Sequence, residues 1–265
     1  MISTTLLTFL FLLVQQYDFR TIWPINLSFD PIKPFILSFV AYVLCYWVLH
    51  FKISGERYVT ILLFPSITVF ALSLLSEILI AGILSEFGQL GLVLLSTIFF
   101  WIFVYITFLT VNVLNVSYIR EIPLGQAGRA SQFILTMIIA YISFFLVFSN
   151  DIFLVFRELF ILFETFLLVY ITLWTIKISK RQRIIASLNI GVLIALLTFI
   201  LSLWPIDSTY IALVLILVFY VCLGIALEIR EFISQFIWVE YISLLVLIFV
   251  MLFLLAEWGI NGHLL

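Results

Sequence analysis

Three charged residues lie within one apolar stretch of the chain, residues 152–176, and their types could support chemistry. They are Arg157, Glu158 and Glu164. Within a membrane helix such residues cost about 3 to more than 10 kcal/mol, and they commonly mark a path for ions or protons. A carboxyl group there could bind a proton or a cation, and a neighbouring arginine could tune its affinity.

The spacing of the polar residues predicts that they share one side of a helix. With Arg157 at zero on the helical wheel, Glu164 lies at ~340°, Thr172 at ~60°, Thr165 at ~80° and Glu158 at ~100°. All of them fall within one arc of about 120°, and the opposite side is rich in aromatic residues. We therefore expect this polar stripe to face the protein interior or a water-filled cavity.

Depth separates the members of the stripe. At ~1.5 Å per residue, Arg157 and Glu158 lie ~7–9 Å from the end of the stretch, so their side chains could reach outward to water. Glu164 lies ~18 Å from that end, near the bilayer centre, and cannot reach water along its own helix. Arg157 and Glu164 are ~10 Å apart between Cα atoms, a gap that two long side chains could bridge directly or through water.

Two hypotheses follow for Glu164. The functional hypothesis makes it a proton- or cation-binding carboxylate that Arg157 tunes. In the structural alternative, Glu164 stabilises the helix packing through a bond either to Arg157 or to a neighbouring helix. The structural alternative is favoured, because one carboxylate beside one arginine is also a common way to hold helices together in a membrane.

Composition indicates which kind of element must position these residues. The 265 residues are 66% apolar and 10% charged, whereas a soluble domain is about 45–50% apolar and about 25% charged. So few polar residues cannot cover a globule, which excludes a soluble enzyme, a nucleic-acid-binding protein and a disordered tail. Barrel strands would alternate over about ten residues, and no such alternation occurs. The predicted fold class is all-α, a polytopic integral membrane helical bundle.

Eight clear helical spans and one weak span cover the chain, which we treat as a single transmembrane domain over residues 1–265. The weak span is residues 2–14, which are short for a bilayer that needs about 20 apolar residues. If that segment only lies at the membrane interface, the number of spans is eight. The clear spans are residues 34–51, 58–79, 90–116, 131–149, 152–176, 184–204, 210–227 and 236–256.

The basic residues predict how the chain is threaded. Lys and Arg favour cytoplasmic loops. The loops after spans two, four, six and eight hold nine of the 12 basic residues, and the alternate loops and the C-terminal tail hold none. Residues 15–33 hold two and are the exception. We expect a prokaryotic cell membrane with the N-terminus and basic loops cytoplasmic and the C-terminus outside.

Smaller features predict local geometry. Pro65 lies within a predicted span and favours a kink. Ser187, Gly191 and Ala195 are spaced four apart, which is typical of a small-residue ridge where two helices approach closely. Residues 117–130 contain two glycines and a proline and are interpreted as a loop, either a plain connection or a docking surface.

The residue sets of most common chemistries are missing from the sequence. His50 and His263 are predicted on opposite faces of the membrane, so they cannot jointly bind a metal or a haem. No serine-hydrolase elbow and no phosphate-binding glycine loop occurs. Basic residues are too few and scattered for nucleic acid. We expect no cofactor and no metal, and we interpret Cys45 and Cys222 as small buried hydrophobes.

These observations favour a non-catalytic subunit or scaffold of a membrane-embedded assembly. Its expected partners are the lipid bilayer and other membrane subunits, without nucleic acid. The alternative is a small secondary transporter or ion-coupled carrier that uses Glu164 and Arg157. A lipid-modifying enzyme is the least supported class, because it would have to draw its acid–base residues from Glu77, Glu158 and Glu164.

Overall fold

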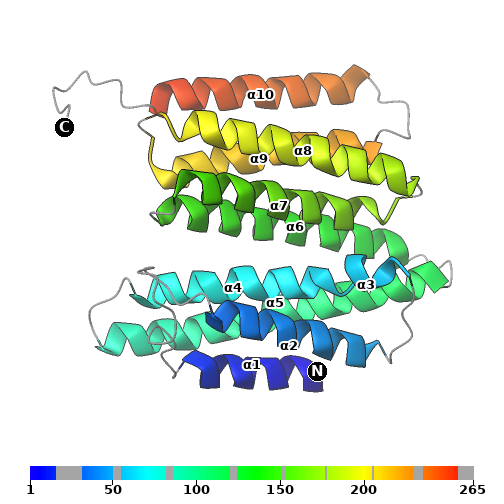
Figure 1. Ribbon diagram of the computed structural model, residues 1–265, viewed down its shortest axis with the longest axis vertical. Helices are drawn as coiled ribbons and strands as arrows, with labels where there is room; N and C mark the ends of the chain where they lie inside the picture. The colour runs from blue at the N-terminus through cyan, green and yellow to red at the C-terminus, as the bar shows by residue number, and fades with distance from the viewer. Residues whose placement is uncertain are drawn as a thin grey trace. The chain divides into compact units, whose positions relative to one another are not determined.

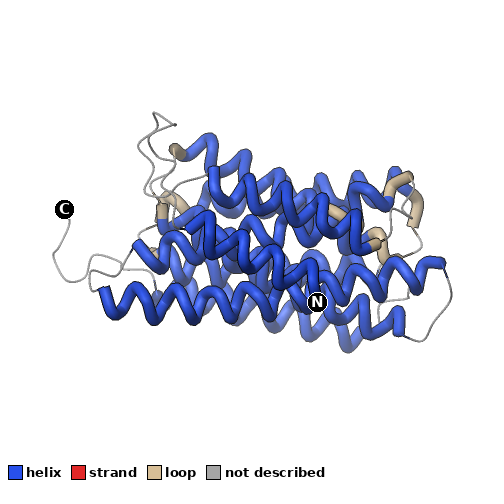
Figure 2. The backbone as a smooth tube through the Cα atoms, turned by 90° about the horizontal axis from the view of Figure 1, so that it is seen from below, coloured by secondary structure: helices blue, strands red, loops and turns tan. Residues whose placement is uncertain are grey.

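The computed structural model is helical throughout its described parts (Figure 1). It describes residues 1–15, 32–49, 55–81, 86–119, 124–150, 153–176, 178–204, 206–228 and 235–255. Within these ranges every regular element is a helix and no strand occurs (Figure 2), so the all-α prediction is confirmed there. Sequence features between the ranges, such as His50, His263 and most of residues 15–33, lie outside the described residues.

The described helices match the predicted spans in number and order, with one short addition. Nine of them have at least 14 residues, and α3 is a single turn of four residues. Their bounds are α1 Ile2–Gln15, α2 Ile32–Val48, α3 Arg57–Thr60, α4 Leu63–Ala81, α5 Glu86–Ile119, α6 Leu124–Ser149, α7 Leu154–Leu173, α8 Lys180–Leu201, α9 Ser208–Glu228 and α10 Gln235–Leu255.

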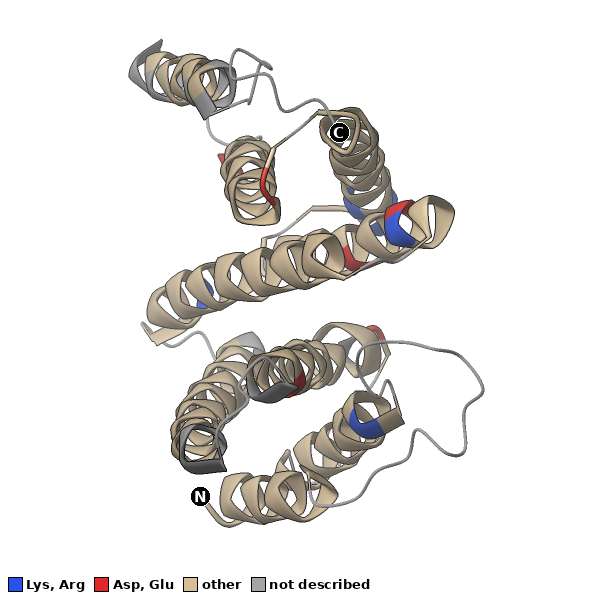
Figure 3. Cartoon of the chain, turned by 90° about the vertical axis from the view of Figure 1, so that its left-hand side faces the viewer, with Lys and Arg blue, Asp and Glu red and all other residues tan. Residues whose placement is uncertain are grey.

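Five stretches of the described chain are long and apolar enough to cross a membrane, which makes the chain an integral membrane protein with about five spans. Charged residues are sparse along the helices (Figure 3). Helices α1 and α2 are apolar but shorter. The full count of eight or nine spans stays a prediction. The five stretches are Tyr58–Leu79, Gly91–Ser117, Leu124–Ser149, Lys180–Leu201 and Ser208–Glu228.

The first compact unit of the chain is Met1–Ile142. In it α2 packs on α4, α4 on α5, and α1 on both α2 and α5. The rings of Phe11 on α1 and Phe100 on α5 stack with centroids 4.3 Å apart, and both side chains are fully buried. Stacked aromatic pairs add attraction beyond the contact area itself, so this pair fastens α1 to α5.

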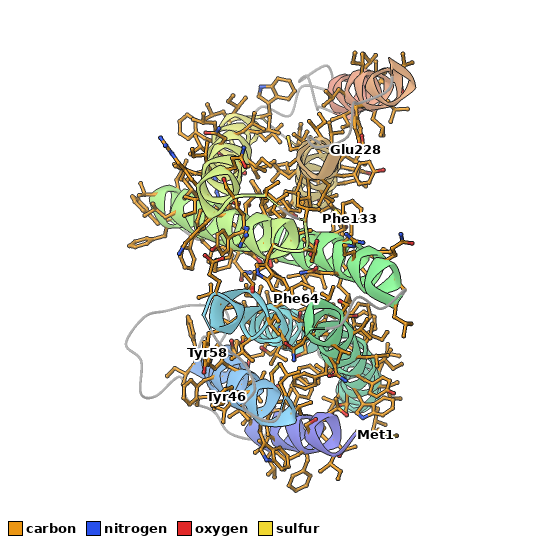
Figure 4. The ribbon with its side chains drawn as sticks, turned by 90° about the vertical axis from the view of Figure 1, so that its right-hand side faces the viewer. Met1, Tyr46, Tyr58, Phe64, Phe133 and Glu228 are labelled. Atoms are coloured by element: carbon orange, nitrogen blue, oxygen red, sulfur yellow. The ribbon has the colours of Figure 1, made fainter. Side chains whose placement is uncertain are left out.

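The predicted span at residues 58–79 is interrupted, because α3 ends at Thr60 and α4 begins at Leu63. The cause is Pro65, which has no backbone N–H and whose ring crowds the preceding turn. Proline is tolerated in the first turn of a helix, and Pro65 lies there in α4. The predicted kink is therefore a break, and it lets Tyr58 of α3 meet Tyr46 of α2 with ring centroids 5.8 Å apart (Figure 4).

Helix α5 is a single helix of 34 residues. At ~1.5 Å per residue it is ~51 Å long, more than the ~30 Å hydrocarbon core, so it must tilt or project.

The interpretation of residues 117–130 as a loop is wrong for most of its length, because α5 runs to Ile119 and α6 begins at Leu124. A Cβ placed on Gly128 would lie 3.0 Å from Val113 Cγ1. The glycine thus serves close helix packing rather than a turn.

The second compact unit is Ser143–Leu265, and it comprises the end of α6 and helices α7 to α10. Helix α7 packs along α8, α8 packs on α9, and α9 packs on α10. Phe144 of α6 and Phe219 of α9 meet edge to face, with centroids 6.2 Å apart. Both rings are buried in the apolar core of this unit, which holds the candidate site.

Helices α7 and α8 approach each other closely at Gly191. A Cβ built on this glycine would lie 3.1 Å from the Leu162 carbonyl oxygen, which is main chain and cannot rotate away. Ser187 and Ala195, four residues to either side, are buried. The predicted small-residue ridge is therefore buried, and at Gly191 it contacts α7, an arrangement that lets two backbones approach in a membrane.

The starts of α8 and α9 are fixed by side chains. Ser179 and Gln182 form a capping box, in which each side chain bonds to the other residue's backbone N–H. This cap explains why α8 begins at Lys180 rather than at the predicted residue 184. Before α9, the Thr209 N–H donates to Asp207 Oδ1 at 2.8 Å, and this bond holds the pKa of Asp207 below its ordinary value.

A larger residue at position 191 should weaken the second unit. We expect Gly191→Val to lower the free energy of unfolding by about 1–3 kcal/mol, because the added carbons have no room against the α7 backbone. The matched control is Gly91→Val, since no atom lies within 4 Å of a Cβ built at Gly91. Thermal unfolding of the purified chain in detergent measures both. Equal melting temperatures for the two variants would contradict close packing at Gly191.

Candidate functional site

The polar stripe predicted on residues 152–176 belongs to α7. Glu164, Thr165 and Thr172 are all buried. Thr172 donates its hydroxyl to the Leu168 carbonyl at 2.8 Å, so its polar group is satisfied by its own helix.

Glu164 is the deepest member of the stripe, the eleventh of the 20 residues of α7. Its side chain is 6% exposed. The Ser143 hydroxyl of α6 donates a hydrogen bond to its carboxyl group. No ion pair of the described residues includes Glu164. The partner of this carboxyl group is therefore a hydroxyl from another helix rather than a cation.

Arg157 does not contact Glu164, although their spacing on the helix would allow a bridge. Its Nε lies 3.8 Å from Glu158 Oε1, and its guanidinium carbon lies 4.8 Å from the ring centroid of Phe148 on α6. A guanidinium above an aromatic face is held by the ring quadrupole. Side chains on a helix lean toward its N-terminus, so Arg157 leans away from Glu164. The direct bridge between these two residues is not among the contacts of the described chain.

Buried polar atoms without a hydrogen-bond partner concentrate on α7. Among the described residues they include Arg157 Nε, both carboxyl oxygens of Glu158, Glu164 Oε2 and Thr165 Oγ1. The 3.8 Å contact between Arg157 and Glu158 is an ion pair but is too long for a hydrogen bond. Because nearly all buried polar groups in proteins are bonded, each exception calls for an explanation.

Many hydroxyl groups on other helices donate to a carbonyl of their own helix. Thr68 donates to the Phe64 carbonyl at 2.9 Å, Thr107 to Phe103 at 2.7 Å, and Thr198 to Ile194 at 2.9 Å. This bond from residue i to i−4 is an ordinary solution for serine and threonine in helices. Thr165 does not use it, which distinguishes this residue both from those three and from Thr172 of its own helix.

The site also contains residues that sequence reasoning missed, Ser143 and Phe148 of α6. A serine and a phenylalanine within an apolar run give no signal on their own. Their part depends on how α6 packs against α7, which a helical wheel of one segment cannot show.

Metal binding has no ready ligand set in the described ranges, where no three His, Cys, Asp or Glu side chains gather closely enough to hold an ion.

Charged residues outside the stripe connect neighbouring helices. Lys33 Nζ of α2 lies 3.5 Å from Glu77 Oε1 of α4, with side chains 12% and 7% exposed. Glu77, named above among possible acid–base residues, is therefore buried against a lysine. Arg183 of α8 lies over the ring of Tyr170 on α7, 5.3 Å from its centroid.

The Lys33–Glu77 pair should behave as an energetic link between α2 and α4. We expect Lys33→Met and Glu77→Gln each to lower the melting temperature in detergent, because each leaves a buried polar partner behind. The double variant should lose less than the sum of the two, with a coupling energy of about 0.5–3 kcal/mol. Arg181→Met, at an exposed position, controls for the loss of one cation. Strictly additive losses would show that the pair contributes nothing.

Comparison with known proteins gives a family but no individual relative. No curated protein and no solved structure matches the chain. The family described as "Protein of unknown function (DUF5656)" matches residues 21–255. This match spans the whole helical region from α2 to α10. The chain is therefore a multi-pass membrane protein that belongs to this family.

Proposed function

We propose that the chain is a non-catalytic subunit or scaffold of a membrane-embedded assembly. The observation that carries this proposal is how its polar side chains are used. Most described hydroxyls donate to a carbonyl of their own helix. The ion pair Lys33–Glu77 and the cation–π contact Arg183–Tyr170 each join two neighbouring helices. Side chains used in this way hold a bundle together rather than line a path for a substrate.

Helix α5 supplies the surface that such a subunit needs. Its span Gly91–Ser117 is the least buried of the five apolar stretches. The uncovered side includes Leu95 and Ile98, which are 64% and 58% exposed. Helices associate in membranes through close van der Waals contact, and the exposed side of this long apolar helix offers such contact to a transmembrane partner.

Co-purification tests the proposal. The tagged full chain, extracted from its own membranes in mild detergent, should elute with a partner in fixed stoichiometry. Leu95→Trp combined with Ile98→Trp should reduce that partner several-fold, because the bulkier rings disturb a packed helix contact. Leu196→Trp on α8, at a position that is 60% exposed, is the matched control and should leave the partner in place. A chain that elutes alone from every extraction would contradict the proposal.

A small ion-coupled carrier is the second candidate, and the unpartnered polar atoms of α7 favour it. Against it, carriers commonly place their site at broken helices near the midplane, whereas α7 is continuous from Leu154 to Leu173. The purified chain alone would then support uptake into proteoliposomes, and Glu164→Gln would abolish it. A lipid-modifying enzyme would instead turn over lipid in the same vesicles.

We also propose nine spans, with the N-terminus cytoplasmic and the C-terminus outside. Labelling at the two ends of α8 tests this orientation. In a chain with Cys45→Ala and Cys222→Ala, we expect Lys180→Cys to react with a membrane-impermeant maleimide only after the cells are permeabilised. Leu203→Cys, two residues beyond the far end of α8 and 67% exposed in the native chain, should react in intact cells. The reverse pattern would overturn the orientation.

A further inference from the structure

The surroundings of Glu164 suit an uncharged acid better than a carboxylate. Its carboxyl group is buried in the second unit and receives one hydrogen bond, from Ser143. Its Oε2 has no hydrogen-bond partner in the described part of the chain. A carboxylate has room for several donors on its two oxygens, and an isolated charged carboxylate is far costlier to bury than a neutral polar group.

The elements around Glu164 bring no cation to it. Residues 143–149 of α6 contain no charged residue, and α9 has only Glu228, at its end. On α8, the basic side chains are confined to the first turn, where Arg183 lies over Tyr170.

Arg183 is well separated from Glu164 along the helices. The part of α8 level with Glu164 is around Gly191, because Gly191 meets Leu162 and Phe166 on either side of Glu164. Arg183 lies eight residues before Gly191, which is ~12 Å along the helix axis.

The charged neighbours on α7 itself are engaged elsewhere. Arg157 lies against Glu158 and Phe148, about two turns before Glu164. Glu158 is itself acidic, so it brings no positive charge that could balance a negative charge on Glu164. Thr165, the next residue, holds a buried hydroxyl oxygen without a hydrogen-bond partner among the described residues. The local polar groups thus leave the charge of Glu164 uncompensated.

We propose that Glu164 is a proton-binding site, at which an exchangeable proton rests on the carboxyl group at neutral pH and Ser143 acts as the positioning residue. The ligand is the proton rather than a metal cation, because one hydroxyl and one carboxyl group are too few oxygens to replace the hydration of an ion. This site goes beyond the scaffold proposal and does not depend on it, since a subunit and a carrier could both contain it.

Infrared spectroscopy of the full chain in lipid tests the proposal directly. The wild type minus Glu164→Gln difference spectrum at neutral pH should contain the carbonyl band of a protonated carboxylic acid. The band should shift in heavy water, because the proton exchanges, and should decrease as the pH rises. Glu158→Gln, the matched control on the same helix, should leave the band in place.

Ser143→Ala separates positioning from a merely structural role. It should move the carbonyl band to higher wavenumber, because the carbonyl oxygen loses a hydrogen bond, without removing it. If Glu164→Gln fails to fold, the wild type alone still tests the proposal. Isotope labelling of the glutamate carboxyl groups identifies the acid band as a glutamate band, and a pH titration then shows whether that band decreases as the pH rises.

A wild type with only ionised glutamates at neutral pH would overturn the proposal. So would an acid band that does not respond to heavy water, because that proton is not exchangeable. A band that sodium chloride removes at constant pH would also overturn it, since the site would then bind a cation. None of these outcomes depends on whether a stoichiometric partner co-purifies.

Discussion

Hydrocarbon offers no hydrogen-bond partners, and the structure of this chain follows from that constraint. A backbone that crosses lipid must satisfy its own polar groups, so the described elements are helices throughout. The same constraint acts on side chains. Ser187, for example, is fully buried, and its hydroxyl donates to the Arg183 carbonyl of its own helix at 2.7 Å.

Cohesion between the helices must then come from shape, because burial away from water provides no driving force within lipid. The close contacts accordingly occur at small residues and at rings. A Cβ on Gly224 of α9 would collide with the Tyr241 hydroxyl of α10, and Gly191 allows the same approach of α8 to α7. In the first unit, the stacked rings of Phe11 and Phe100 hold α1 against α5. Polar links such as Lys33–Glu77 add specificity to this packing.

Hydropathy predicted the number and order of the long helices, because the length of an apolar run is set by the bilayer. Their ends were less predictable. The starts of α6 and α8 contain glycine, serine and basic residues that suggest a loop, but a capping box and a glycine contact make them helical. Pro65 correctly predicted where the helix is interrupted, but the interruption is a break between α3 and α4 rather than the predicted kink. Local composition does not reveal whether tertiary contacts will extend a helix beyond its apolar run.

The candidate site was predictable only as far as one helix defines it. Glu164, Thr165 and Thr172 are buried, but Tyr170 on the opposite side of the helix is buried as well, so near Thr172 burial is not confined to the predicted face. The partners Ser143 and Phe148 come from α6, and no pattern within α7 specifies them. The contacts of Arg157 also depended on the lean of side chains along a helix rather than on residue spacing alone.

Arg157 and Glu164 lie on one stripe, but the free-energy cost of placing a charge in the membrane is lowered differently for each. The cost of a charge increases with depth, and a side chain near a helix end can reach the interface. Arg157, in the first turn of α7, keeps its charge beside Glu158 and the ring of Phe148. Glu164, half-way along the helix, has no counter-charge in the described chain and lies too deep for its side chain to reach the interface along its own helix. A proton is the smallest group that neutralises it, and one hydroxyl from Ser143 is then a sufficient partner.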